Sequence, residues 1–239
     1  MRTAVFSDVH GNLPALETFV ALTQGCVDAY VCLGDVVGYG PWNDECLEVI
    51  HALPNVVFLE GNHERMFRDP ARVRNELPLV QEFFARSFES FTRLDLIAGL
   101  PRTHRVGHFA CAHTLEERNI YRDTDVVPRE DTIIGHSHHA FAAVKGGHLL
   151  VNCGSIGQNR RRLDVLTYVL LDSDGGDFRL CAAPWPVETF LGECESRRYP
   201  EACMDYLSAK AFDRNQSATF VCECHHYAGP LPKHMPDFP

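Results

Sequence analysis

The stretch Ser7-Asp8-Val9-His10-Gly11-Asn12 follows a short apolar run, Ala4-Val5-Phe6, near the start of the chain. Such a run predicts a buried strand, and the proline that comes next, Pro14, suits the first turn of a helix. Alternate residues of an extended strand point to the same side, so we expect Asp8 and His10 to aim at one point. A carboxylate and an imidazole placed in this way are good ligands for a divalent metal ion.

The same arrangement recurs after the next predicted strands. Strands are expected at residues 29–33, 56–59, 108–112 and 132–134, separated first by helices and later by a polar loop over 115–131. They end in Gly34-Asp35, Gly61-Asn62-His63-Glu64, His113-Thr114 and Gly135-His136-Ser137-His138. Strands that alternate with helices indicate parallel βαβ units, which bind ligands beyond the carboxyl ends of their strands. The sequence therefore predicts an α/β fold with a polar site at those ends.

The remainder of the chain predicts further helices and a strand-rich second half. Helices are expected at 43–52, at 187–197 and at 201–210, and one long helical region at 77–100 carries an aromatic stripe that we interpret as core packing. Further strands are expected at 140–144, 148–151, 165–171 and 178–183. The Pro- and His-rich residues from Asp213 onward show little periodicity, so we predict one domain over 1–212 and an extended or loosely packed tail over 213–239.

Composition excludes several classes of protein. The 239 residues are 45% hydrophobic and carry a formal net charge of −10, which argues against a nucleic-acid binder that depends mainly on electrostatics. No signal peptide and no apolar run of membrane-spanning length is evident, so we expect a cytoplasmic protein without a membrane partner. The 10 cysteines are irregularly spaced and resemble no secreted disulfide framework.

One cysteine and histidine cluster lies in the predicted tail. Cys222, Cys224, His225 and His226 are too close together for the paired elements of a closed zinc site. We therefore prefer adventitious metal binding, or none, to a structural zinc site.

The polar residues at the strand ends form a coherent set. Five successive strand ends deliver Asp, Asn or His, which is hard to explain by chance, although any one histidine alone is more often an ordinary polar residue. Together they offer enough imidazole and carboxylate for two metal ions, with Asp35 able to bridge them. Two ions roughly 3.5–4 Å apart can clamp the attacking and leaving oxygens of a displacement at phosphorus. The set is Asp8, His10, Asp35, Asn62, His63, His113, His136 and His138.

These residues and their spacing resemble the five ordered blocks of the calcineurin-like metallophosphoesterase superfamily. The opening Ser-Asp-Val-His-Gly-Asn, the run from Gly34 to Pro41 and the run from Asn152 to Gly157 are similar to its small single-domain prokaryotic phosphodiesterase branch. The resemblance implies an αββα sandwich of two mixed β-sheets flanked by helices.

The resemblance also implies roles for the site residues. One metal ion would be held by Asp8, His10, Asp35 and His138, and a second by Asp35, Asn62, His113 and His136. His63 would then be the proton donor to the leaving group, assisted by Asp8 or Asp35. Imidazole suits this role because its ordinary pKa is near 6.5. Manganese, iron, nickel and zinc all remain open as the metal.

One departure from larger members of the superfamily bears on the substrate. Ser/Thr protein phosphatases have an arginine shortly after the Gly-Asp block that holds phosphate, and no arginine stands there in this sequence. Its absence argues against a phosphoprotein phosphatase and against the related symmetrical dinucleoside tetraphosphatase. Another arginine could bind the phosphate instead, although each candidate could equally be a solvated surface charge. The candidates are Arg65, Arg118, Arg122, Arg160, Arg161 and Arg162. Tyr39 and Trp42 could stack on a nucleobase, but packing explains them at least as well.

We therefore expect a binuclear metal-dependent phosphoesterase that hydrolyses small phosphodiester or nucleotide substrates. Alternatives within enzymes are asymmetrical cleavage of dinucleoside polyphosphates and a nuclease acting on short single strands of nucleic acid. An alternative from another class is a non-catalytic protein-binding scaffold on the same fold. Such a scaffold would be expected to lack some of the metal ligands or the proton donor, whereas this sequence has the full set. A homo-oligomer remains open.

Overall fold

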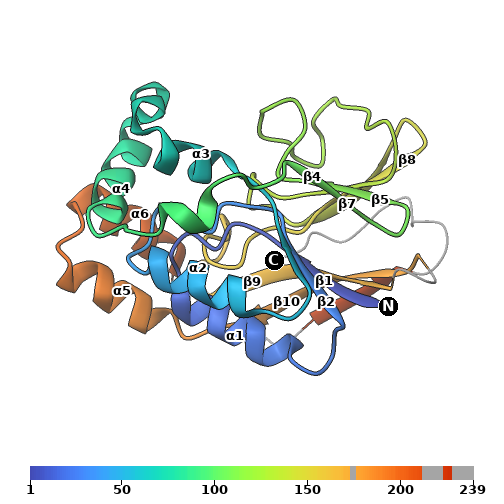
Figure 1. Cartoon of the computed structure of the whole chain (residues 1–239), viewed down its shortest axis with the longest axis horizontal. Helices are drawn as coiled ribbons and strands as arrows, with labels where there is room; N and C mark the ends of the chain where they lie inside the picture. The colour runs from blue at the N-terminus through green and yellow to red at the C-terminus, as the bar shows by residue number, and fades with distance from the viewer. Residues whose placement is uncertain (173–175, 212–222, 228–239) are drawn as a thin grey trace.

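Two mixed β-sheets stacked face to face form the centre of this computed structural model, which describes residues 1–172, 176–211 and 223–227 (Figure 1). One sheet has six strands in the order β11-β10-β9-β1-β2-β3. These are Glu223–Tyr227, Phe178–Pro184, Val165–Asp172, Arg2–Phe6, Ala29–Cys32 and Val56–Phe58. The other has five strands in the order β4-β5-β6-β8-β7. These are Thr103–Val106, Phe109–Ala112, Thr132–Ile134, His148–Asn152 and Phe141–Lys145.

Strand direction shows why both sheets are mixed. In the first sheet β1 pairs in parallel with β2 and antiparallel with β9. In the second, β6 pairs in parallel with both β5 and β8, while β7 and β8 form an antiparallel hairpin. The predicted α/β fold class, with two mixed sheets flanked by helices, is confirmed.

The side chains of β1 alternate between two cores. Val5 points into the space between the sheets and belongs to the same apolar cluster as Phe109 and Val169. Ala4 and Phe6 point the other way, into a larger cluster beneath the helices. Since successive residues of a strand face opposite sides, a strand that is apolar throughout is buried on both faces. This explains the unbroken apolar run at the start of the chain.

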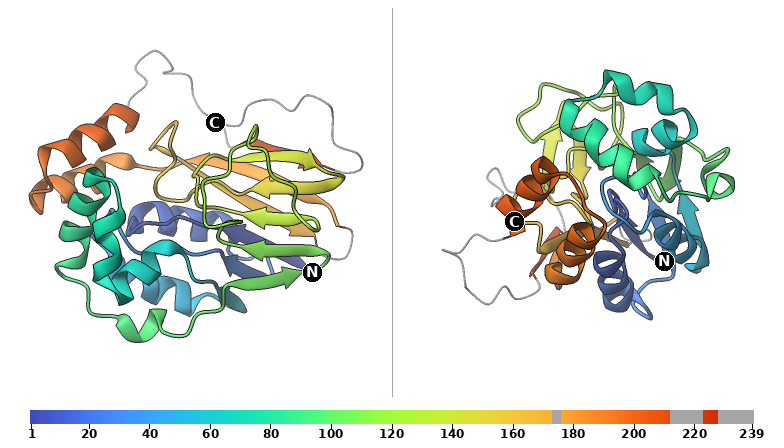
Figure 2. Two further views of the ribbon diagram at one scale, coloured as in Figure 1. Left: turned by 90° about the horizontal axis from the view of Figure 1, so that it is seen from above. Right: turned by 90° about the vertical axis from the view of Figure 1, so that its left-hand side faces the viewer.

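The helices gather over the outer face of the six-stranded sheet and at one end of the molecule (Figures 1 and 2). They are α1 Leu13–Thr23, α2 Asn43–Ala52, α3 Asn62–Arg68, α4 Pro78–Phe88, α5 Val187–Ser196 and α6 Glu201–Ala211. Asn12 caps α1 by accepting the N–H of Ala15, and Pro14 lies in the first turn as predicted. The outer face of the five-stranded sheet is covered by the polar loop, where Ile120 and Val126 pack on Phe141.

The predicted helical region over 77–100 is wrong as a single element. Helix α4 ends at Phe88, and a short 3₁₀ helix follows at Leu94–Ile97. The turn between them brings Phe91 back against Phe67, with ring centroids 4.8 Å apart, and Phe67 also contacts Phe84 and Phe88. The aromatic stripe is core packing as predicted, but packing on Phe67 rather than helix continuity places its last members.

Three short elements escaped the sequence prediction. Helix α3, a 3₁₀ helix at Pro70–Asn75 and strand β4 lack the length that apolar periodicity needs. Helix α3 matters most because its first turn carries two of the predicted site residues, Asn62 and His63.

The predicted tail contributes a strand to the sheet. Strand β11 pairs antiparallel with β10, so these residues are not loosely packed. Cys222 and the side chains of Cys224, His225 and His226 lie outside the described residues, and so does the tail on either side of β11. The domain boundary at residue 212 stays a prediction.

Two remaining sequence expectations bear on the environment of the chain. No helix that the structure describes is long and apolar enough to cross a membrane. The cysteines within the described part of the chain are free, and all except Cys26 are buried, as expected for small apolar side chains.

Candidate metal centre

The carboxyl ends of β1, β2 and β3 meet those of β5 and β6, and the segments that follow these strands carry all eight predicted site residues, with Asn62 and His63 in the first turn of α3. Asp8 and His10 are completely buried, and Asp35, His63, His113 and His138 are at most 5% exposed. Burying this many polar side chains is costly unless they are satisfied by one another or by a bound cation. The cluster is therefore a built site and not a random gathering of polar residues.

The backbone at these loops explains how the side chains converge. Five predicted ligands have positive φ angles: Asp8 at 59°, His10 at 53°, Asp35 at 54°, His136 at 67° and His138 at 58°. Left-handed backbone at residues other than glycine costs on the order of 1–3 kcal/mol each and persists where the surrounding structure imposes it. The reasoning that put Asp8 and His10 on one extended strand is wrong, because β1 ends at Phe6 and left-handed turns aim both side chains.

Two glycines allow the loops to approach one another. A Cβ at Gly61 would lie 2.1 Å from Asp35 Oδ1, and a Cβ at Gly135 would lie 2.3 Å from Ser7 Oγ. Both distances are far below van der Waals contact, so only glycine leaves room for the neighbouring loop.

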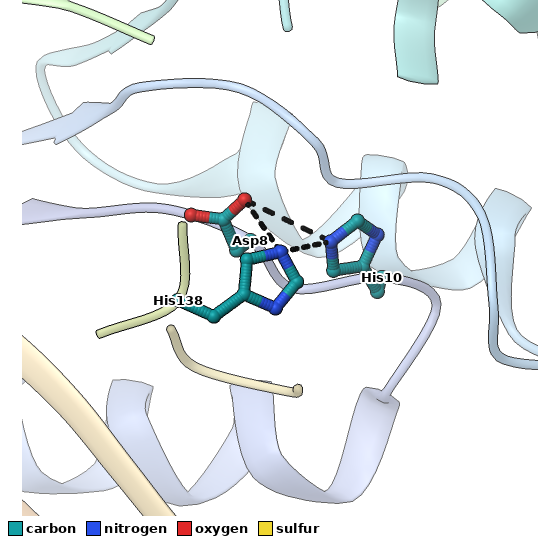
Figure 3. Close-up of side chains that lie close together, drawn as sticks. All are labelled: Asp8, His10 and His138. Atoms are coloured by element: carbon teal, nitrogen blue, oxygen red, sulfur yellow. Dashed lines mark hydrogen bonds and ion pairs between the residues drawn. The ribbon is translucent and has the colours of Figure 1, made fainter. Parts of the chain in front are cut away.

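Asp8, His10 and His138 form what we call the closed group (Figure 3). The Nε2 atoms of His10 and His138 are 3.1 Å apart, and Asp8 Oδ1 lies 3.2 Å from His138 Nε2. Each ring donates its Nδ1–H to a backbone carbonyl, His10 to Val37 at 3.2 Å and His138 to Gln158 at 2.7 Å. Because a carbonyl oxygen can only accept, each neutral ring keeps its proton on Nδ1 and turns a lone pair on Nε2 inward.

The electrostatics of the closed group fit a bound cation. Burial lowers the pKa of both His10 and His138, so both rings are neutral and two lone pairs face each other. Asp8 Oδ1 is buried and has no hydrogen-bond donor among the residues that the structure describes. Two nitrogens that bind one ion at about 2.1 Å with a right angle between the bonds lie about 3.0 Å apart, close to the observed separation. The donor set and its spacing suit a divalent metal ion.

Asp35, Asn62, His113 and His136 form the open group. Its centre is His113 Nε2, which lies 3.0 Å from Asn62 Oδ1, 3.1 Å from His136 Nδ1 and 3.2 Å from Asp35 Oδ2. His113 donates its Nδ1–H to the carbonyl of Leu33 at 3.2 Å, so the neutral form of this ring turns an Nε2 lone pair inward. Although burial opposes it, the charge of Asp35 raises the pKa of His113 to about 9. The open group thus attracts a positive charge, which a proton supplies when no metal ion is bound.

Asp35 connects the two groups. It lies within 4.8 Å of His113 and His136 on one side and of His10 and His63 on the other, measured between possible ligand atoms. Its Oδ1 also accepts the backbone N–H of His63 at 2.8 Å. This position suits the bridging role that the sequence suggests for Asp35.

Glu64 is a residue whose part sequence reasoning missed. Its fully buried carboxylate accepts the backbone N–H groups of Asp35, Val36 and Gly61 at 2.7–2.8 Å. Burial and the charge of Asp35 raise its pKa to about 7. Glu64 fastens the loop after β2 to the start of α3 and so positions Asp35. Its place in the Gly-Asn-His-Glu block was the available signal.

The segment from Asn152 to Gly157 shapes the first loop. Ser155 Oγ donates to the carbonyl of Asp8 at 2.7 Å, and the N–H of Gly157 donates to the same carbonyl at 3.0 Å. A Cβ at Gly157 would lie 1.9 Å from the carbonyl oxygen of Val9. This segment therefore holds Asp8 in its left-handed conformation.

His63 lies beside the centre at the first turn of α3. Its ring meets that of His10 edge-on, with centroids 4.6 Å apart, and its buried Nδ1 has no hydrogen-bond partner among the described residues. Burial lowers the pKa of His63 to about 4, against the opposing charge of Asp35. Its imidazole is therefore neutral at pH 7.

The residues considered for nucleobase stacking and for phosphate binding have different surroundings in the structure. Tyr39 is 4% exposed and packs on His10 and Phe83, with ring centroids 4.7 Å apart in both cases, so it is a packing residue and not a nucleobase platform. Arg160 lies over the Tyr39 ring, 5.6 Å from its centroid. Arg65 and Arg118 instead line a cavity of about 820 Å³ that the open group reaches through Asn62 and His136.

A family profile described as a calcineurin-like phosphoesterase superfamily domain matches residues 1–176. The chain belongs to this superfamily. The match includes all eight predicted site residues, and the resemblance seen in the sequence blocks is confirmed.

Individual relatives agree with this assignment. The uncharacterized protein MJ0912 of Methanocaldococcus jannaschii is 25% identical over 228 residues, which cover 83% of this chain and 93% of that protein. A metallophosphoesterase from Sphaerobacter thermophilus superposes with a TM-score of 0.72 at 23% identity, covering 88% of this chain and 99% of its own. A hypothetical protein, PH1004 from Pyrococcus horikoshii OT3, superposes with a TM-score of 0.71 at 17% identity, covering 86% and 97%. At these identities the two solved structures establish the fold.

Proposed function

We propose that this protein is a binuclear metal-dependent phosphodiesterase that hydrolyses small phosphodiester or nucleotide substrates. The observation that carries the proposal is the convergence of imidazole lone pairs and carboxylate oxygens in two adjacent groups joined by Asp35. No side-chain proton satisfies Asp8 Oδ1, and neutral His10 and His138 have none to share on Nε2. Two divalent cations would satisfy both groups.

The closeness of the side chains and the membership of the superfamily support the following ligand sets. Asp8, His10, Asp35 and His138 would hold one ion, and Asp35, Asn62, His113 and His136 the other. When bound, such a pair of ions lowers the pKa of a water molecule and neutralises charge on the phosphoryl oxygens. Manganese, iron, nickel and zinc are all compatible with mixed oxygen and nitrogen ligands.

The chain's own residues supply orientation and a proton. The carbonyls of Leu33, Val37 and Gln158 fix the three ligand rings by accepting their Nδ1–H groups. His63 is the proton donor to the leaving alkoxide. Its ring lies against His10 at the centre, and its buried Nδ1 has no hydrogen-bond partner among the described residues, which leaves that nitrogen available for proton transfer.

The test is hydrolysis of bis-p-nitrophenyl phosphate by metal-stripped protein to which manganese, nickel, iron(II) or zinc is restored. Wild type is measured beside His63→Ala at equal metal content. Turnover that depends on metal supports the proposal. Two bound ions without turnover for any of the metals would contradict it and would favour a protein-binding scaffold.

A further inference from the structure

The cavity next to the open group carries more basic than acidic side chains. Its lining includes five arginines and three glutamates, together with Asn62 and His136 of the metal centre. A second, smaller cavity of about 310 Å³ shares Arg65, Arg102 and Glu117 with the first and reaches His113. Arg65 and Arg102 therefore line both cavities beside the metal centre.

Helix α3 sets the distance between these arginines and the metal centre. Arg65 follows Asn62 by three residues, so the two side chains are neighbours on one face of the helix. Arg102 lies just before β4, and its side chain is 61% exposed. Both arginines line the larger cavity together with Asn62 and His136, so one ligand in that cavity can contact the open group and both guanidinium groups.

Glu117 now occupies the space between the two arginines. Arg65 donates to it in a bidentate pair, Nη1 to Oε1 at 3.0 Å and Nη2 to Oε2 at 2.6 Å, and Arg102 also donates to Oε1. The hydrogen bonds from Arg65 lower the pKa of Glu117 to about 2, so it is ionised at neutral pH. A carboxylate and a phosphate present the same pair of oxygens to a guanidinium fork.

Glu117 is much more exposed to solvent than Glu60, the other carboxylate near these arginines. Its side chain is 57% exposed, whereas that of Glu60, which pairs with Arg68 and lies 3.9 Å from Arg102, is 8% exposed. Glu116 and Glu117 both have left-handed backbone, with φ angles of 56° and 53°. Consecutive left-handed residues other than glycine are strained, so this loop is held in a costly backbone conformation while Glu117 meets the two arginines.

We propose that Arg65 and Arg102 form a recognition site for a second phosphate group of the substrate, which Glu117 occupies until the substrate binds. The inference rests on the proposed function and narrows it. The substrate class becomes a phosphodiester that bears a further phosphate, and Glu117 acts as an internal competitor for that phosphate.

A matched pair of chromogenic substrates tests this proposal. Thymidine 5′-(p-nitrophenyl phosphate) and its 3′-phosphorylated form have the same scissile diester and the same leaving group. For wild type we expect kcat/KM to be roughly tenfold higher for the phosphorylated form. Arg102→Gln should bring this ratio to about one, because it removes one of the two guanidinium groups that would hold the second phosphate.

The Arg105–Glu130 pair provides the matched control. It is an exposed arginine–glutamate pair whose arginine lies on β4, and it lines neither cavity. Arg105→Gln should keep the wild-type ratio. Glu117→Gln should lower KM for the phosphorylated substrate severalfold, because it removes the competitor, and Glu130→Gln should not.

Binding to metal-stripped protein gives a readout that does not depend on turnover. Calorimetric titration should show tighter binding of thymidine 3′,5′-bisphosphate than of thymidine 5′-monophosphate, and Arg102→Gln should abolish the difference. Turnover of the plain diester with a ratio near one in wild type would overturn this inference alone. A ratio that changes equally in Arg102→Gln and Arg105→Gln would also overturn it. No metal-dependent turnover of either diester would overturn the proposed function and this inference together.

Discussion

The two halves of the metal centre are built from the same kinds of residue but differ in access. In the closed group Asp8 and His10 are 0% exposed and His138 is 3% exposed, and none of the three lines the cavities described above. In the open group Asn62 and His136 line the larger cavity and His113 the smaller one. In both groups a backbone carbonyl orients the ligand ring. Under the proposed function, the closed group is suited to retaining an ion and the open group to meeting a substrate.

Asp35 joins the halves, so its loss is expected to have the largest effect. Asp35→Asn should reduce bound metal from two ions to fewer than one per chain, because the amide cannot bridge. Turnover should fall by roughly a thousandfold or more, about 4 kcal/mol of transition-state stabilisation. Elemental analysis of the purified variant measures the metal content. Asp95→Asn, at an exposed residue paired with Arg93, is the control, and two ions in Asp35→Asn would refute the bridging role.

Removing the acid should leave both halves intact. His63→Gln is expected to keep two ions but to slow hydrolysis of an alkyl phosphodiester by about 10²–10⁴-fold, the usual contribution of a general acid. With p-nitrophenolate as the leaving group the loss should be well below this, since that group departs without a proton. Steady-state rates for the two substrates decide the question. Equal losses would indicate that His63 acts in binding instead.

The difference in access should be visible as a difference in metal release. With excess chelator we expect wild type to lose its two ions in two phases that differ by roughly tenfold or more in rate, because burial and oriented ligands slow exchange. His136→Ala should lose the fast phase and His10→Ala the slow one. A colorimetric metal indicator follows the release. A single phase in wild type would mean that the two halves exchange their ions alike.

A smaller effect is expected from the basic residues on the closed side. Lys210 Nζ lies 3.1 Å from the centroid of the Tyr206 ring and has no hydrogen-bond partner among the described residues. Burial and the charge of Arg160 lower its pKa to about 6 from an ordinary 10.5. Between these values the unfolded chain binds the proton more tightly than the folded chain, so stability rises with pH.

Lys210→Met should therefore raise the midpoint of thermal unfolding of the metal-free protein by roughly 2–4 °C at pH 7. The gain should be largest near pH 6 and fade toward pH 10. Scanning calorimetry across this range measures it. Lys145→Met, which removes a lysine that donates to the carbonyl of Thr124, should show no such trend. An equal rise in both variants would mean that the burial of Lys210 is not the cause.

Much of the fold and most of the candidate site could be predicted from the sequence, for identifiable reasons. Apolar strands that end in Asp, Asn or His mark both the sheet and its functional edge, because a strand is local and its polar end follows it directly. Eight side chains that were predicted from five separate segments do come together. Their roles as ligands and acid stay predictions.

Other features of the structure could not be predicted, because they depend on contacts between residues far apart in the sequence. Helix α3 is only seven residues long, and Glu64 fastens its start to the loop after β2, a contact across 29 residues. The turn after Phe88 exists because Phe91 packs on Phe67. Sequence periodicity contains no information about either partner.

The residue types at the strand ends, and their order along the chain, could be predicted from the sequence. The folded chain was needed to show how these residues converge and which group is closed. It was also needed to show that Arg65 and Arg102 are paired with Glu117. This is because residue chemistry and the strand pattern depend only on residues that are close together in the sequence. Left-handed backbone at Asp8 and His10, burial, and pairing across 52 residues between Arg65 and Glu117 arise only when distant segments pack together.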